Sequence, residues 1–159
     1  MNLTTYPISA SETLMTFEFI STGPKGKISK KIYFQPTHFE GVFNLAFGDK
    51  EDDTDDLNDE TVSNNGDKEK ILATIAHTVL IFTNFHPDAW IYATGSTKAR
   101  TRLYRMGLNK ILDEIANDYE LFGELEDQWI PFKKNTEFQG FLFRRKKKNS
   151  NFTQPSIAK

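Results

Sequence analysis

The stretch from Trp90 to Ala116 constrains the fold of this chain more than any other part of the sequence. It reads WIYATGSTKARTRLYRMGLNKILDEIA and begins with a run, Trp90 to Thr94, that is apolar on both sides of an extended backbone. A strand with that pattern is covered on both faces. A Gly-Ser-Thr turn and a long amphipathic segment follow, so we predict a central strand that leads directly into a helix packed on the sheet.

The predicted helix runs from about Thr97 to Asn117, with Ser96 or Thr97 as its cap. Its buried stripe has helical spacing and consists of Leu103, Leu108, Ile111, Leu112 and Ile115. A second set follows steps of three and four residues and is expected to share one exposed face: Lys98, Arg102, Arg105 and Asn109.

Strand periodicity marks five further segments of the chain. In residues 14–21, Met15, Phe17 and Phe19 alternate with polar residues, and the Gly- and Pro-rich residues 22–26 predict a hairpin turn. Comparable runs occupy residues 28–35, 43–47, 119–125 and 138–144. Lys30 interrupts the apolar side of its run, which predicts a sheet edge or a frayed strand start.

A second helix is predicted from Lys68 to Phe85, between an Asp67 N-cap and the helix-ending His86-Pro87 pair. Its apolar face consists of Ile71, Leu72, Ile75, Ala76, Val79 and Phe82. Its narrower polar stripe consists of Lys70, Thr74, His77 and Thr78.

Together these segments predict one α+β domain over residues 1–145. We expect a mixed, largely antiparallel β-sheet of about six strands with two helices packed on it, in the order β-β-β-α-β-α-β-β. Residues 1–12 are expected to be a loosely held lead-in, 49–66 a flexible acidic loop, and 146–159 a disordered basic and polar tail.

Charge is distributed unevenly along the chain. Residues 49–60 contain eight acidic residues and one lysine, whereas residues 144–148 read RRKKK. The acidic run lacks the glycine of an EF-hand loop, so we interpret it as a solvated loop, a cation site or a docking surface for a basic partner. The basic run either solubilises the chain end or contacts phosphates.

Few features point to catalysis or to a membrane. The chain has no cysteine and no HExxH, GxSxG or Walker-type loop, and its three histidines, His38, His77 and His86, lack metal-ligand spacing. We therefore expect no metal and no cofactor. The N-terminus has no secretory pattern and no apolar run reaches about 20 residues, so we expect a cytoplasmic protein that does not enter a membrane.

The start of the helix predicted at residues 97–117 is the most specific candidate site. Free N–H groups at a helix N-terminus favour anions, and arginine offers paired donors that suit phosphate. The candidate anion-binding residues are Gly95, Ser96, Thr97, Lys98, Arg100, Arg102 and Arg105. Alternatively, these cations are solvated or pair with the protein's own acids.

Four motifs together resemble a family of small bacterial proteins found mainly in Bacteroidetes. They are GPKG at 23–26, FGD at 47–49, NNGD at 64–67 and GSTKARTRLYRMGLNK at 95–110. The resemblance covers roughly residues 5–145. It implies a bacterial cytoplasmic protein and assigns no activity or functional residue.

Three hypotheses about function follow from these residues. The first is a non-enzymatic binding module for a phosphate-bearing ligand, such as RNA or DNA, at the basic helix start. The second is a protein-interaction module, such as one half of a toxin–antitoxin pair, that docks a partner on residues 49–60. The third is a nuclease or transferase that uses Arg100, Arg102, Tyr104 and His77.

Overall fold

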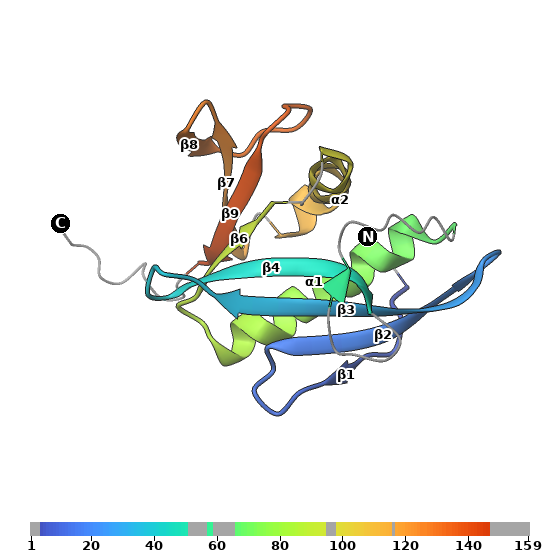
Figure 1. The fold of residues 1–159 in the computed structure, drawn as a ribbon. Coiled ribbons are helices and arrows are strands. Elements are labelled where there is room, and N and C mark those ends of the chain that lie inside the picture. Colours follow the sequence, from blue (N-terminus) through green and yellow to red (C-terminus); the bar gives the residue numbers. More distant parts are fainter. Residues whose placement is uncertain (1–3, 51–56, 59–65, 95–97, 116, 147–159) are drawn as a thin grey trace.

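A computed structural model of the chain describes residues 4–50, 57–58, 66–94, 98–115 and 117–146 (Figure 1). Its strands are β1 (Ser9–Ala10), β2 (Thr16–Gly23), β3 (Gly26–Pro36), β4 (Val42–Lys50), β5 (Leu57–Asn58), β6 (Trp90–Ala93), β7 (Tyr119–Leu125), β8 (Gln128–Pro131) and β9 (Gly140–Arg145). Its helices are α1 (Lys68–Phe85) and α2 (Lys98–Ile115). The expected α+β class and the order of the main elements are confirmed.

All of these strands belong to one mixed sheet, in the order β1-β2-β3-β4-β6-β9-β7-β8, with β5 paired to β4. The β4–β6 pair is parallel and the remaining pairs are antiparallel. The nine strands exceed the six expected. The additional ones are β1, β5 and β8, which are two to four residues long and therefore too short to show a clear period.

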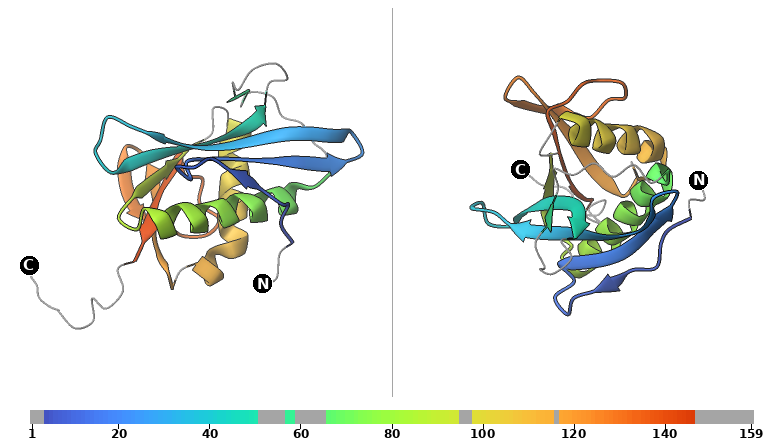
Figure 2. Two further views of the ribbon diagram at one scale, coloured as in Figure 1. Left: turned by 90° about the horizontal axis from the view of Figure 1, so that it is seen from below. Right: turned by 45° about the vertical axis from the view of Figure 1, so that its right-hand side comes forward.

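The core lies between the helices and one face of this sheet. Phe34 on β3 stacks on Phe82 of α1 with ring centroids 4.2 Å apart, and Phe43 on β4 meets the same ring edge-on at 5.1 Å. Figure 2 shows α1 running along one side of the sheet, with α2 crossing it. At this crossing Gly107 faces Leu72, and a Cβ on Gly107 would come within 2.8 Å of that leucine side chain.

The polar stripe predicted for α1 is wrong at two of its four positions. Thr74 and Thr78 are fully buried, whereas His77 is exposed. Each threonine hydroxyl donates to a backbone carbonyl of its own helix, so it enters the core with its donor satisfied. Thr74 also accepts the backbone N–H of Tyr6 at 2.9 Å.

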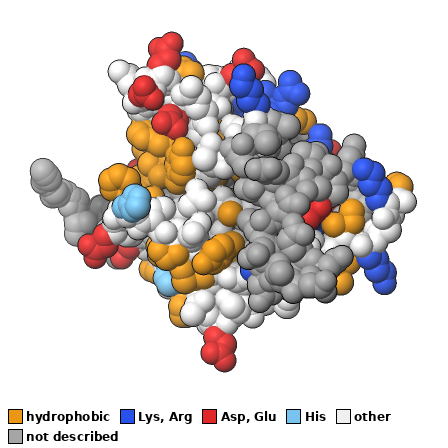
Figure 3. Space-filling view, viewed as in Figure 1, with side chains coloured by type: hydrophobic (Ala, Val, Ile, Leu, Met, Phe, Trp, Pro, Cys, Tyr) orange, Lys and Arg blue, Asp and Glu red, His pale blue; other side chains and the backbone are white. Residues whose placement is uncertain are grey.

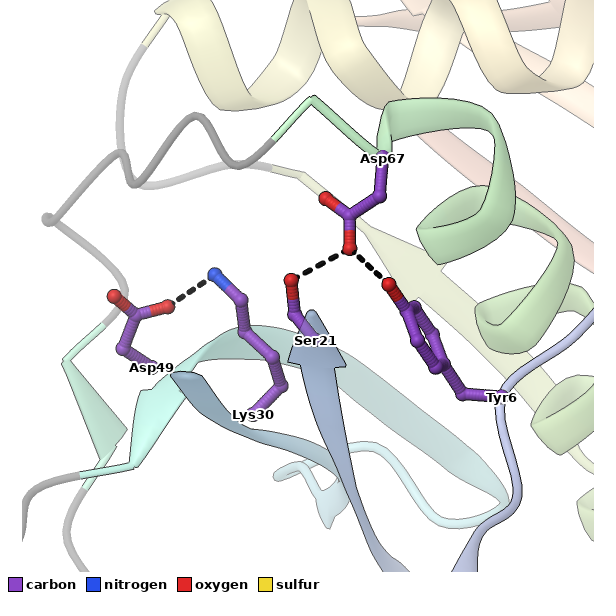
Figure 4. A network of polar contacts seen from close by, with 5 residues as sticks. All are labelled: Tyr6, Ser21, Lys30, Asp49 and Asp67. Atoms are coloured by element: carbon purple, nitrogen blue, oxygen red, sulfur yellow. Dashed lines mark hydrogen bonds and ion pairs between the residues drawn. The ribbon is translucent and has the colours of Figure 1, made fainter. Parts of the chain in front are cut away.

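The N-terminal segment is held in place at Tyr6, contrary to the loose lead-in expected for residues 1–12, of which residues 4–12 are described. Tyr6 is only 5% exposed, and its hydroxyl donates to the carboxylate of Asp67 (Figure 4). Ser21 on β2 donates to the same carboxylate oxygen. Asp67 occupies the N-cap position of α1 as predicted, but its carboxylate does not make the predicted capping bond to the helix. Its carboxylate instead connects three separate segments of the chain.

Lys30 is also placed differently from the prediction of a sheet edge. It lies within β3, between β2 and β4, and is 3% exposed. Its ammonium group pairs with the carboxylate of Asp49 on the neighbouring strand (Figure 4). Asp49 therefore belongs to β4 rather than to the acidic loop, and it compensates the charge of a lysine that is buried in the sheet.

Much of the predicted acidic loop and the basic tail lies outside the described residues, which omit 51–56, 59–65 and 147–159. The short strand β5 within the acidic region pairs with the end of β4. Among the described residues, neither helix has the length and apolar character needed to cross a membrane.

Candidate functional site

The cationic row predicted on α2 is only partly available to a ligand. Lys98 and Arg102 are exposed. Arg105 retains 19% of its side-chain exposure, and its Nη1 atom lies 3.7 Å from Oε1 of Glu137. Asn109, at the far end of the row, has a buried side-chain oxygen that finds no hydrogen-bond partner among the described residues. The exposed face therefore covers the first part of α2 and not its middle.

The remaining candidate residues of this site are not placed. The turn that precedes α2 and one arginine side chain fall outside the described part of the chain: Gly95, Ser96, Thr97 and Arg100. Tyr104, which the third hypothesis used as a reacting group, is 6% exposed and belongs to the core. The tyrosine that the nuclease or transferase hypothesis used is therefore not accessible to a substrate.

A broad groove of about 830 Å³ opens on the sheet face that the helices do not cover. Six neighbouring strands contribute lining residues, among them Gln35, Asn44, Tyr92, Leu142, Glu124 and Trp129. Along the strands these positions alternate with core residues such as Phe34, Leu45 and Phe141. The alternation explains why the lining side chains point away from the helices.

The groove is bounded at one end by Pro36, the last residue of β3, and by the turn between β3 and β4, which contributes His38 and Phe39. Phe39 is 72% exposed, and Trp129 at the other end is 42% exposed. Figure 3 shows hydrophobic side chains gathered on the left of that view, with acidic groups above and below them. Large aromatic side chains at both ends of one groove are typical of a binding surface.

The most organised part of the groove is a corner formed by Tyr92, Glu124 and Trp129. The Tyr92 and Trp129 rings stand at 85° to each other with centroids 5.8 Å apart. The Tyr92 hydroxyl donates to Oε1 of Glu124 at 3.3 Å, and Glu124 lies directly across from Trp129 in the sheet. Two perpendicular aromatic walls and a carboxylate thus meet at one point.

A glycine provides the space for this corner. Gly140 on β9 lies beside Glu124, and a Cβ built there would be 3.1 Å from both Glu124 Oε1 and the Tyr92 hydroxyl. That separation is tighter than an ordinary van der Waals contact, so a larger residue would push the carboxylate and the phenol out of their positions.

The environment of Tyr92 favours its neutral, hydrogen-bonding form. Burial raises the pKa of its phenol above the ordinary value of 10.0, and the negative charge of Glu124 raises that pKa further. Hydrogen bonding with Thr94 acts in the opposite direction, and its effect on the pKa is smaller than that of burial or of the Glu124 charge. Tyr92 therefore remains a donor to Glu124 and keeps the carboxylate directed into the corner.

A second aromatic–carboxylate set lies on the same sheet face and is already filled. The guanidinium of Arg144 stacks 4.3 Å from the centroid of the Trp90 ring, and its Nε donates to Glu120 at 3.0 Å. Glu124, four residues further along β7, has no such partner. Among the described residues, its carboxylate contacts no lysine or arginine.

These features can now be compared with known proteins. A family model described as "Family of unknown function (DUF6934)" matches residues 2–146. The chain belongs to this family. The match confirms the expected membership of a family without an assigned function, and its span includes all the residues of the groove in this DUF6934 chain. Neither the curated proteins nor the solved structures contain a significant match.

Sequence reasoning missed the groove of this DUF6934 protein, although part of its signal was present. In β7 the residues Glu120, Phe122 and Glu124 alternate with core-facing ones, and Trp129 follows after a polar turn. Nothing in the linear sequence indicates that these side chains lie beside Tyr92. That proximity results from β9, which pairs with both β6 and β7.

Proposed function

We propose that the protein is a non-catalytic interaction module and that its outer-face groove binds a cationic group of a partner. The observation on which this depends is the corner of Tyr92, Glu124 and Trp129, in which no lysine or arginine of the described residues pairs with the carboxylate. The proposal retains the interaction-module hypothesis and moves its docking surface from residues 49–60 to the groove. We also propose that the protein is cytoplasmic, as the sequence led us to expect.

The chemistry of the corner suits a guanidinium or an ammonium group. Aromatic faces attract cations through their quadrupole, and a carboxylate accepts paired hydrogen bonds from a guanidinium. The neighbouring set supports this assignment, because Trp90 and Glu120 hold the protein's own Arg144 in this way. The Tyr92–Trp129 corner offers the same combination of groups to an arginine or lysine from outside.

The first prediction concerns Glu124. N-acetylarginine amide, titrated while the tryptophan fluorescence is recorded, should bind the wild-type protein, and Glu124→Gln should weaken that binding about tenfold. The reason is the loss of a charge-assisted hydrogen bond, which is worth roughly 1.5–3 kcal/mol.

Glu12→Gln is the matched control, because Glu12 is an exposed acid beside β2, far from β8 in the strand order. N-acetylglutamine amide controls for contacts that do not involve charge. Equal arginine binding by the wild-type protein and Glu124→Gln would contradict the proposal.

A phosphate-bearing ligand at the start of α2 is the second candidate function. The supporting observation is that Lys98 and Arg102 are exposed and that Arg105 has only a distant partner. Glu137 is 90% exposed, and ion pairs between exposed groups typically contribute about 0–1 kcal/mol. A phosphate could therefore replace Glu137 at Arg105 at little energetic cost.

The second prediction tests this candidate. If α2 binds phosphates, a labelled single-stranded RNA should bind with an affinity that falls as salt is raised, and Arg102→Glu with Arg105→Glu should abolish binding. Glu124→Gln, on the other face of the sheet, should leave RNA binding unchanged. If the double variant binds RNA as tightly as the wild-type protein at every salt concentration, the phosphate site is rejected.

A further inference from the structure

The shape of the groove limits what can fill it. Its lining crosses six neighbouring strands, from Gln35 on β3 to Trp129 on β8. Three strand spacings, β4–β6, β6–β9 and β9–β7, separate the turn between β3 and β4 from Glu124 on β7, and at about 4.8 Å each they give roughly 14 Å. An extended peptide rises about 3.3 Å per residue, so about four residues cover that distance. The two ends of the groove are therefore farther apart than a single amino acid can reach.

The two ends of the groove differ in character. At the β3–β4 end the lining includes Pro36, Phe39 and Val42, with Phe39 largely exposed. At the β8 end are the Glu124 carboxylate and the perpendicular rings of Tyr92 and Trp129. A ligand that fits both ends has an apolar group at one end and a cation at the other.

Charges around the groove favour a basic ligand and disfavour a nucleic acid. The turn between β7 and β8 exposes Glu126 and Asp127 next to the Glu124 end, and the β3–β4 turn exposes Glu40 at the other end. Arg144 is ion-paired with Glu120 on the same face. Phosphates would meet carboxylates at both ends of the groove, whereas a lysine- or arginine-containing segment would be attracted.

From these observations we infer that the groove binds an extended, basic peptide segment of a partner protein. An arginine or lysine of the segment enters the corner of Tyr92, Glu124 and Trp129. A leucine or aromatic residue about four positions away packs against Phe39. This inference depends on the proposed function, because the cationic corner is the same, and it adds the class of partner and a second contact point.

The test uses a fluorescein-labelled heptapeptide with leucine at position 2, arginine at position 6 and serine or threonine elsewhere, and fluorescence anisotropy as the readout. We expect the wild-type protein to bind this peptide at least tenfold more tightly than N-acetylarginine amide. Phe39→Ala should remove most of that gain and leave the affinity for the amide unchanged. Glu124→Gln should weaken the binding of both the peptide and the amide.

Two controls make the result specific. Ile20→Ala removes another half-exposed apolar side chain, on β2 outside the groove, and should leave peptide affinity unchanged. A peptide with glutamate at position 6 should not bind. Thermal unfolding of each variant, followed by circular dichroism, verifies that the fold is retained.

The outcomes distinguish this inference from the proposed function. If the amide binds through Glu124 but the heptapeptide binds no more tightly, or Phe39→Ala has no effect, the extended-peptide inference is wrong and the cationic corner stands. If neither ligand binds, both are wrong. Binding of single-stranded RNA that Glu124→Gln strengthens and Phe39→Ala weakens would assign the groove to nucleic acid and overturn the inference.

Discussion

At the scale of single residues, polar groups in this protein act across long separations in sequence. The carboxylate of Asp67 receives hydroxyl groups from Tyr6 and Ser21, and Asp49 neutralises Lys30 inside the sheet. Glu124 is different, because its side chain receives a hydrogen bond from Tyr92 and no cation from the described residues. A carboxylate beside aromatic rings, with no counter-charge from the described part of the chain, is the residue-level basis for the proposed binding site.

Tyr92 leads to a prediction about alkaline stability. Its pKa is raised in the folded protein, so the folded state keeps a proton that the unfolded state releases above about pH 10. The free energy of unfolding should therefore fall as pH rises above 10, and it should fall less in Tyr92→Phe. Urea unfolding at pH 9 and pH 11 measures the difference.

Tyr33→Phe, on β3 and away from Glu124, serves as the control for this experiment. If wild type and Tyr92→Phe lose the same stability between the two pH values, the environment described for Tyr92 is incorrect.

At the scale of elements, the β7–β8 hairpin has an unusual turn. Its two central residues, Glu126 and Asp127, both have positive φ angles, 51° and 63°. Hairpin turns of this kind favour Asn-Gly, because side chains larger than asparagine are strained there. The hairpin thus keeps two carboxylates beside the groove at a cost in local backbone energy.

Replacing this turn should separate stability from binding. Glu126→Asn with Asp127→Gly should raise the free energy of unfolding by about 1 kcal/mol, because asparagine and glycine adopt these angles readily. The same change should weaken binding of the heptapeptide, because it removes acidic groups near the peptide's arginine. Urea unfolding and anisotropy measure the two effects.

Glu126→Gln with Asp127→Asn is the comparison variant, since it removes the charges and leaves much of the backbone strain. Stability no higher in the Asn-Gly variant than in this comparison variant would show that the turn is unstrained.

At the scale of the whole molecule, local patterns predicted the elements and their approximate limits. The predicted helix of residues 68–85 matches α1, because a wide apolar face and a terminal His-Pro pair are local signals. The strand at Trp90 is likewise central, between β4 and β9, but it is not covered on both faces as predicted, because Tyr92 lines the open groove. Local patterns failed at Lys30 and Thr74, since burial of a polar group depends on a partner that is distant in sequence.

The two candidate sites also differ in whether local sequence patterns could predict them. The basic start of α2 could be read from the sequence because its residues are neighbours on one helix. The groove could not, because its residues come from six strands whose order differs from their order along the chain. β9, the last strand, inserts between β6 and β7 and so brings Tyr92 beside Glu124.

The sequence alone therefore determined the α+β class, the two helices, the central strand at Trp90 and the cationic residues of α2, all of which depend on spacing along a single element. Only the tertiary structure decided which sheet face stays open, how Lys30 and Asp67 are compensated, and that an aromatic corner encloses Glu124. The physical reason is that strand order and register place side chains together across distances that no local period records.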